Sequence, residues 1–130
     1  MGVVEVVKVP SEHNEQVWLF EWAKAMKAQY PALGLMFAIP NGGKRHIGTA
    51  RKLKAEGVKA GVPDIFLPHA AGDWLGLFLE LKRLKGGKMS ETQQNWTRKL
   101  REAGYRVETC KGWVEASEAI LAYLRTKGGR

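Results

Sequence analysis

The sequence has one cysteine and no long apolar run, and both absences narrow what the chain can be. Cys110 has no second cysteine with which to form an intramolecular disulfide. This excludes a disulfide-stabilised scaffold and favours a reducing compartment, where Cys110, at the end of an apolar run, is expected to be buried and inert. No apolar run approaches the roughly 20 residues of a membrane span, and the first residues lack the apolar core of a signal peptide. We therefore expect a cytoplasmic protein.

Acidic residues are also scarce, at 13 against 21 basic ones, which gives a net charge of +8. The excess is local: residues 44–59 and 82–101 together hold 13 basic residues and only two acidic ones. Such asymmetry indicates a face that binds a polyanion, because neutralising phosphates supplies most non-specific affinity for nucleic acids. Two solvated basic surfaces would explain the charge alone equally well.

The 130 residues show no internal repeat, low-complexity tract or linker-like change of composition, so we expect one domain over residues 1–130. Hydrophobic periodicity and turn residues predict four helices and four strands. The expected helices cover residues 11–30, 46–56, 90–103 and 113–124, and the expected strands cover 33–39, 65–67, 75–82 and 105–110. This order predicts an α/β fold with a central mixed β-sheet flanked by helices.

The strand expected over residues 75–82 carries the main anomaly. Because side chains alternate along a strand, one face must be core. That face consists of Leu75, Leu77, Leu79 and Leu81. Glu80 and Lys82 share the other face, about 7 Å apart by strand rise. Charges at the end of an apolar strand are costly to bury unless they are paired or bound to a metal.

A second carboxylate belongs to the preceding strand, which Asp64 opens directly after Pro63. If the two strands form a hairpin with its turn near Ala71 and Gly72, Asp64 lies opposite the Leu79–Glu80 end. Two carboxylates and a lysine would then converge at one end of the sheet.

That group suits phosphodiester hydrolysis. Oxygen ligands from Asp64, Glu80 and a nearby backbone carbonyl would bind Mg²⁺ or Mn²⁺, which lowers the pKa of bound water. Lys82 would orient or deprotonate the attacking water or stabilise the developing phosphorane, and the sequence leaves these roles open. On its own, a strand that ends in Glu-x-Lys is also common as a solvated edge pair.

The residues around this group resemble a known family. Gly61-Val62-Pro63-Asp64 followed by Glu80-Leu81-Lys82 resembles the PD-(D/E)XK nuclease signature in the form of the VRR-NUC (virus-type replication-repair nuclease) family. Ser90, Gln93 and Trp96 are similar to that family's S-x-x-Q-x-x-W helix opening, residues 100–105 to its L-x-x-x-G-Y/F exit, and residues 41–45 to a loop of phage and prophage members. The resemblance extends from about Ser11 to Tyr123 and implies a restriction-endonuclease-like αβββαβ core.

The resemblance also implies roles. Asp64 and Glu80 become metal ligands, the carbonyl of Leu81 offers a third, Lys82 becomes the catalytic lysine, and Gln93 supports the site. The family also uses a glutamate of the first helix, for which two residues qualify. Glu15 lies on the helix stripe expected to face the sheet and is favoured on that ground, although the spacing of Glu12 fits the family pattern about as well. Either can instead be only an acid that complements the helix dipole.

The basic segments supply expected DNA contacts: Lys44, Arg45, Arg51, Lys52, Lys85 and Lys88. Of the five tryptophans, spacing places most in the core, and Trp74, in a turn, is the one expected to stack on a base or pack against a partner.

The implied function is a structure-selective DNA endonuclease, dependent on Mg²⁺ or Mn²⁺, that acts on branched or Holliday-junction DNA in replication, recombination or repair. Because a junction has near two-fold symmetry, a homodimer is expected. The alternatives are a DNA-binding module that keeps the fold but does not cut, and a basic structural or RNA-associated protein with a chance motif.

Overall fold

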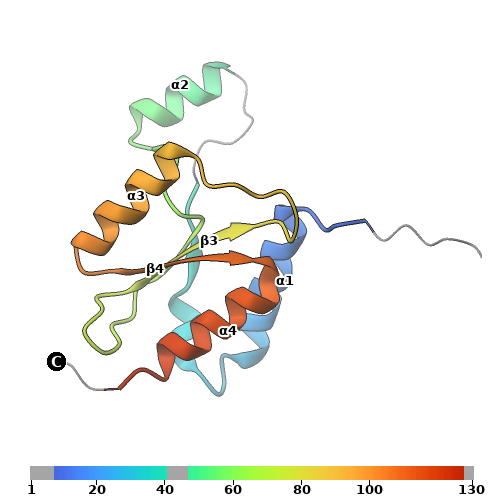
Figure 1. Ribbon diagram of the computed structural model, residues 1–130, viewed down its shortest axis with the longest axis vertical. Coiled ribbons are helices and arrows are strands. Elements are labelled where there is room, and N and C mark those ends of the chain that lie inside the picture. Colours follow the sequence, from blue (N-terminus) through green and yellow to red (C-terminus); the bar gives the residue numbers. More distant parts are fainter. Residues whose placement is uncertain (1–7, 41–46, 128–130) are drawn as a thin grey trace, which may run out of the picture.

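The computed structural model describes residues 8–40 and 47–127, whose elements surround one four-stranded sheet (Figure 1). The α-helices are α1 (Glu12–Met26), α2 (Ile47–Ala55), α3 (Glu91–Glu102) and α4 (Gly112–Leu124), and η1 (Pro31–Leu35) is a 3₁₀ helix. The strands are β1 (Phe37–Ala38), β2 (Ile65–Leu67), β3 (Leu77–Lys82) and β4 (Arg106–Lys111). In the described part of the chain, no helix is long and apolar enough to cross a membrane.

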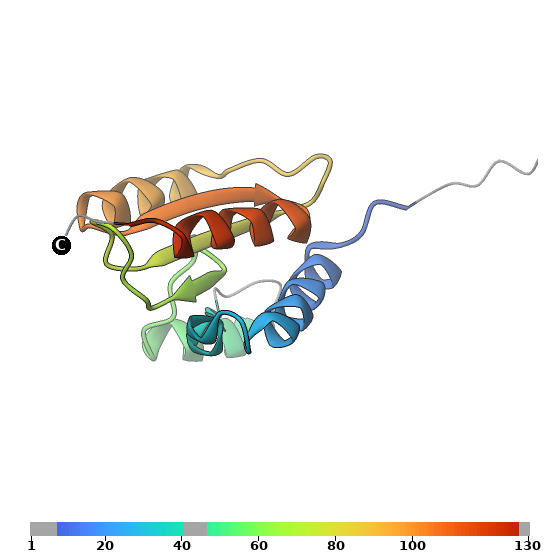
Figure 2. The same cartoon turned by 90° about the horizontal axis from the view of Figure 1, so that it is seen from below.

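The sheet is mixed, as predicted, with the strand order β1-β2-β3-β4. The first two pairings are antiparallel, whereas β3 and β4 run parallel because α3 connects them as a crossover. Helices α1 and α4 pack against each other and against the central strands, and α3 lies on the opposite face (Figure 2). This is the α/β architecture that the sequence predicts.

The two faces of β3 differ in the expected way. Leu77, Leu79 and Leu81 are almost completely buried in the core formed with α1 and α4. On the other face, Phe78 stacks on Phe66 with 4.2 Å between ring centroids, and Glu80 follows it on the same side. The period-two alternation therefore directs the charged end of the strand toward α3.

Cys110 is 2% exposed on the core side of β4. Burial raises the pKa of its thiol to about 12, with smaller contributions from Glu115 and Glu108. The expectation of a buried cysteine is thereby confirmed, and a thiol with a raised pKa forms little of the reactive thiolate.

Leu75 is a correction to the predicted core, because it is 39% exposed and β3 begins two residues later. Its backbone N–H donates to the carbonyl of Gly104 at 2.9 Å, and its side chain lies over that glycine, where an added Cβ would come within 3.0 Å. Leu75 thus contacts the turn after α3 at the rim of the sheet rather than entering the core.

The buried strand expected over residues 33–39 is also wrong in extent and burial. Pro31 starts the 3₁₀ helix η1, and only Phe37 and Ala38 pair with β2, both exposed. A proline fixes φ and suits the first turn of a helix, so the chain coils before it extends. Leu33 and Met36 alone of this segment enter the core, which leaves β1 as a short, exposed edge strand.

Candidate active site

The carboxyl end of β3 brings together the three residues that the sequence singles out. Ile65 lies opposite Leu79 in the antiparallel register, which places Asp64 beside the Glu80 end of β3 as the hairpin predicts. The Oδ2 atom of Asp64 accepts a hydrogen bond from the backbone N–H of Leu81 at 2.8 Å. Asp64 is therefore fixed by the backbone of the strand that carries the other two groups.

Gln93 connects the rest of the site. Its Nε2 donates to Glu80 Oε1 at 2.9 Å, and its Oε1 accepts from Lys82 Nζ at 2.9 Å. The same Oε1 accepts from the backbone N–H of Ser90, in a capping box at the start of α3. Because the capping box fixes the position of Gln93 in the first turn of α3, its side chain holds Glu80 and Lys82 in place from that helix.

Glu80 and Lys82 are 2% and 8% exposed, and Lys82 Nζ lies 3.7 Å from Glu80 Oε1. Burial, and then the neighbouring carboxyl of Asp64, raise the pKa of Glu80 to about 8, with Lys82 acting in the opposite direction. Two carboxyl groups thus share a site that disfavours two negative charges. A cation would reverse that penalty.

The carboxylates of Asp64 and Glu80 form a small donor set for a divalent metal. Within residues 8–40 and 47–127, no group of three or more histidine, cysteine, aspartate or glutamate side chains is placed to hold a metal ion. The chemistry nevertheless fits Mg²⁺ or Mn²⁺, which are often held by one or two carboxylates while keeping several waters. Glu80 Oε2 is buried and has no hydrogen-bond partner, so this oxygen is available as a ligand for a cation.

The two first-helix glutamates occupy different positions. Glu15 is 3% exposed, and its Oε2 is buried without a hydrogen-bond partner. That oxygen lies within 2.8 Å of where a Cβ would stand on Gly112, at the start of α4. Glu12 is exposed, yet its charge is among those that raise the pKa of Glu80. Glu12 therefore contributes to the raised pKa of Glu80, less than burial and Asp64 do.

The expected DNA contacts lie on two segments. Arg51 and Lys52 are exposed on α2, which packs against no other helix or strand in the described part of the chain and projects from the body (Figure 1). Lys85 and Lys88 are exposed in the segment between β3 and α3. Lys44 and Arg45 lie outside the described residues.

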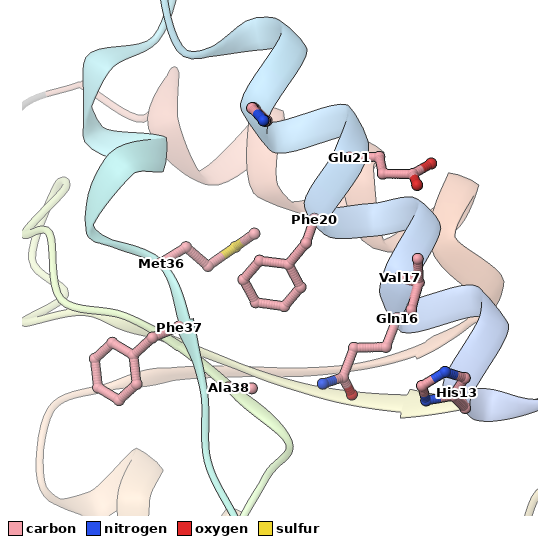
Figure 3. Close-up of a pocket in the computed structure, with 9 residues that line it drawn as sticks. His13, Gln16, Val17, Phe20, Glu21, Met36, Phe37 and Ala38 are labelled. Atoms are coloured by element: carbon pink, nitrogen blue, oxygen red, sulfur yellow. The ribbon is translucent and has the colours of Figure 1, made fainter.

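A groove of about 610 Å³ runs between α1 and the edge strand β1. Phe20 and Met36 point toward each other across it, and His13 and Gln16 border one end (Figure 3). Val17 and Phe37, at its rim, are 41% and 49% exposed. This apolar surface has no counterpart among the sequence predictions.

The comparisons with known proteins identify the family and agree with the fold. Residues 10–113 match the family model described as the VRR-NUC domain. The chain belongs to the VRR-NUC family. A solved structure described as a "VRR_NUC domain protein" is 26% identical and superposes with a TM-score of 0.81, covering 95% of this chain and 96% of that one. No curated protein matches the chain.

Membership of the VRR-NUC family supports a nuclease-like domain with DNA as its partner, in a family that typically uses divalent metals. One expectation about tryptophans needs correction: spacing places most of them in the core, but Trp18 is 39% exposed, and Trp96 stays outside the main core and lines a surface recess. Trp74 is partly buried against the core, with the Arg106 guanidinium 5.9 Å from its ring centre, and its contact with a base or a partner stays a prediction. Helical spacing alone does not separate a tryptophan at a helix margin from one in the core.

Proposed function

We propose that this VRR-NUC domain is a metal-dependent, structure-selective DNA endonuclease that hydrolyses phosphodiester bonds in branched or Holliday-junction DNA during replication, recombination or repair. The observation that carries the proposal is the hydrogen-bonded group of buried Glu80 and Lys82 with half-buried Asp64 and Gln93, in which Glu80 keeps one oxygen without a partner. The buried, unpartnered oxygen of Glu80 is available to a cation, and Glu15 Oε2 on α1 is unpartnered in the same way.

Asp64, Glu80 and the backbone carbonyl of Leu81 would hold the Mg²⁺ or Mn²⁺ ion. When bound, the metal supplies Lewis acidity toward a phosphate oxygen and lowers the pKa of a coordinated water. Glu12, whose charge contributes to the raised pKa of Glu80, is the first-helix residue that we assign to this site, and Glu15, which the sequence favours, becomes the second choice.

Lys82 is the group that acts on the reacting atoms. Gln93 Oε1 and Glu80 Oε1 hold its ammonium at 2.9 and 3.7 Å, so its position is set before DNA arrives. In that position it orients the attacking water and stabilises negative charge that develops on the phosphate. Gln93 is a positioning residue, since it acts on DNA only through Glu80 and Lys82.

The basic residues proposed to contact DNA lie on two chain segments, α2 and the connection between β3 and α3. Arg51 and Lys52 on α2, together with Lys85 and Lys88 before α3, would neutralise backbone phosphates. Lys44 and Arg45 stay part of the proposal from the sequence. The protein would act in the cytoplasm of a bacterium or of a phage-infected host cell.

A homodimer suits a branched substrate, since two cuts related by a two-fold axis need two sites. The groove between α1 and β1 is the surface we assign to the second copy. It combines exposed Val17 and Phe37 with a sheet edge that is unpaired within the described chain, and such edges are normally covered or paired.

A cleavage panel tests the proposed function. Four-way junctions, flaps, splayed arms and linear duplexes are incubated with the wild-type protein and Mg²⁺ or Mn²⁺, beside the Asp64→Ala variant. We expect a branched DNA to be cut fastest and Asp64→Ala to cut none. If the wild type binds the DNAs but leaves all of them intact, the chain is a binding module that keeps the nuclease fold, and the proposal fails.

A further inference from the structure

A recess of about 360 Å³ lies next to the candidate active site, on the side of α2. Its lining comes from three stretches of chain: Ile39 and Pro40 after β1, residues 56–59 and 62 between α2 and β2, and Trp96 on α3. The volume is at the lower end of the range for small-ligand pockets. The recess therefore suits one planar group rather than a duplex.

The recess is tied directly to the candidate catalytic residues. The backbone N–H of Ile39 donates to the carbonyl of Asp64 at 2.7 Å, and Val62 precedes Asp64 by two residues. Trp96 follows Gln93 by one helical turn, about 5 Å along α3, on the same side of that helix. A strand whose phosphate lies at Asp64 and Glu80 would thus have an adjacent nucleotide within reach of Trp96.

The chemistry of the lining favours a nucleobase over a phosphate. The Nε1–H group of Trp96 donates to the carbonyl of Ala60 at 3.1 Å, which fixes the indole beside the apolar wall of Val58 and Val62. A fixed indole is a stacking platform for any base. Glu56, at the rim, would repel a phosphate but can accept a hydrogen bond from the exocyclic amino group of a base.

The surrounding charge supplies the complementary contact for the backbone of that nucleotide. Lys59 lines the recess, and Arg51, Lys52 and Lys54 are exposed on α2, which ends one residue before Glu56. We infer that the recess binds one unpaired nucleobase of the DNA strand held at the active site, stacked on Trp96. This inference rests on the proposed function, and it gives a physical reason for preferring branched DNA: only unpaired nucleotides enter without the cost of unstacking a duplex.

An abasic scan tests the recess without requiring cleavage. Fluorescently labelled splayed DNAs, whose fork fixes the register, each lack one base at a successive position of one arm. They are titrated with the wild-type protein in Ca²⁺ in place of Mg²⁺, so that a cation is present at the carboxylates, and affinity is read by anisotropy. We expect one position at which loss of the base weakens binding roughly tenfold, the effect of one lost base–aromatic stack. A flat profile would overturn the inference.

Two variants and a matched control locate the effect. Val58→Phe fills the recess, and Trp96→Leu removes the stacking platform. The control, Val114→Phe, makes the same valine-to-phenylalanine change at an exposed position of α4. We expect the recess variants to bind the intact strand about as weakly as the wild type binds the sensitive abasic strand, and to lose the position effect. Thermal melting checks that each variant folds, and the wild-type scan stands even if one does not.

The possible outcomes separate the two claims. If Val58→Phe and Trp96→Leu show the same dependence of affinity on the position of the missing base as the wild type and Val114→Phe, the recess does not bind a base. This conclusion would hold even if the protein cuts DNA. If the scan succeeds but no DNA is cleaved with any metal, the recess stands and the proposed nuclease function fails.

Discussion

At the scale of single residues, the site depends on keeping an acidic side chain at position 80 inside a largely apolar sheet. Glu80 is 2% exposed, lies beside Asp64, and has a pKa raised to about 8 by burial and by that neighbour. In the absence of metal this arrangement costs stability whenever both carboxyl groups are ionised. The cost is consistent with a residue retained for binding a cation rather than for folding.

Replacing Glu80 by Gln should therefore stabilise the metal-free protein and abolish its response to metal. Since the pKa is raised in the folded state, the wild type should lose stability as pH rises from about 4.5 to about 8, where the unfolded chain releases a proton that the folded chain retains. Melting in EDTA should show a flatter pH profile for Glu80→Gln and, at pH 8, a gain of roughly 3–5 °C for about 1 kcal/mol.

Addition of Mg²⁺ should raise the wild-type melting temperature and leave that of Glu80→Gln unchanged, because only the wild type gains a ligand that binds the folded state. A variant that is less stable than the wild type in EDTA at pH 8, or one that still responds to Mg²⁺, would contradict the assignment of Glu80.

Gln93 has two roles that can be separated. It belongs to the capping box of α3 and it holds Glu80 and Lys82. Gln93→Ala should lower Mn²⁺ affinity and the cleavage rate by about 10–100-fold, the usual effect of losing a group that orients metal ligands. Ser90→Ala removes only the hydroxyl half of that capping box and keeps the Ser90 N–H that donates to Gln93 Oε1. It should therefore cost about 1 kcal/mol of stability while Mn²⁺ affinity stays unchanged.

Calorimetric titration with Mn²⁺ and thermal melting of both variants provide the measurement. If Ser90→Ala lowers metal affinity as much as Gln93→Ala does, Gln93 acts only through the stability of α3.

The sequence is informative about the triad and less so about its surroundings. Strand alternation places Glu80 and Lys82 on one face, and the turn near Gly72 predicts the register that brings Asp64 beside them. The first-helix glutamate was not decidable, because the rotation of α1 against the sheet determines whether position 12 or 15 faces the carboxyl pair. That rotation is set by tertiary packing with α4, which no local pattern records.

At the scale of elements, α2 is unusual because it packs against no other element in the described part of the chain. Its exposed Arg51, Lys52 and Lys54 form no ion pair with the described residues, so an electrostatic role outside the chain explains them best. Elements with few packing contacts are also those whose sequence is least constrained by the core.

Neutralising α2 with Arg51→Gln, Lys52→Gln and Lys54→Gln should weaken DNA binding for all sequences. If the three charges contact phosphates, the slope of log affinity against log salt should decrease by roughly 2–3. Anisotropy titrations at several salt concentrations measure this slope.

The control removes the same number of exposed charges from outside both basic segments, with Lys8→Gln, Lys27→Gln and Lys127→Gln. An equal change in slope for both triple variants would mean that net charge, rather than α2, determines binding.

The element most poorly predicted is the one before α2. An apolar run over residues 33–39 is typical of a buried strand, but Pro31 and the short pairing of β1 produce a 3₁₀ helix and an exposed edge instead. Short apolar runs are ambiguous in this way because their burial depends on what covers them.

At the scale of the whole molecule, the edge strand β1 forms one wall of the groove beside α1. Because Phe37 is 49% exposed at this edge, Phe37→Lys should convert the proposed dimer into a monomer in analytical ultracentrifugation and reduce paired incision of four-way junctions. Val114→Lys, at 53% exposure on α4, is the matched control and should remain dimeric. A monomeric wild type, or dissociation by Val114→Lys alone, would refute the assignment of the groove.

The overall architecture was largely predictable, since strand and helix order with a hairpin followed by a crossover helix define a mixed sheet. The grooves were not, because they form between segments distant in sequence, such as α1 with β1 and Trp96 with residues 56–62. Surfaces of this kind depend on which side chains fail to meet a partner, and only the assembled fold shows that.

The most direct measurement of the central claim is the single-turnover rate of phosphodiester cleavage by the wild type, Asp64→Ala and Lys82→Met on one branched DNA, with Mg²⁺ and with EDTA, beside binding measured in EDTA. The account predicts cleavage by the wild type that requires the metal, loss of at least about 10²-fold in both variants, and DNA affinity that is little changed. Undiminished cleavage by either variant, or wild-type cleavage that persists in EDTA, would contradict it.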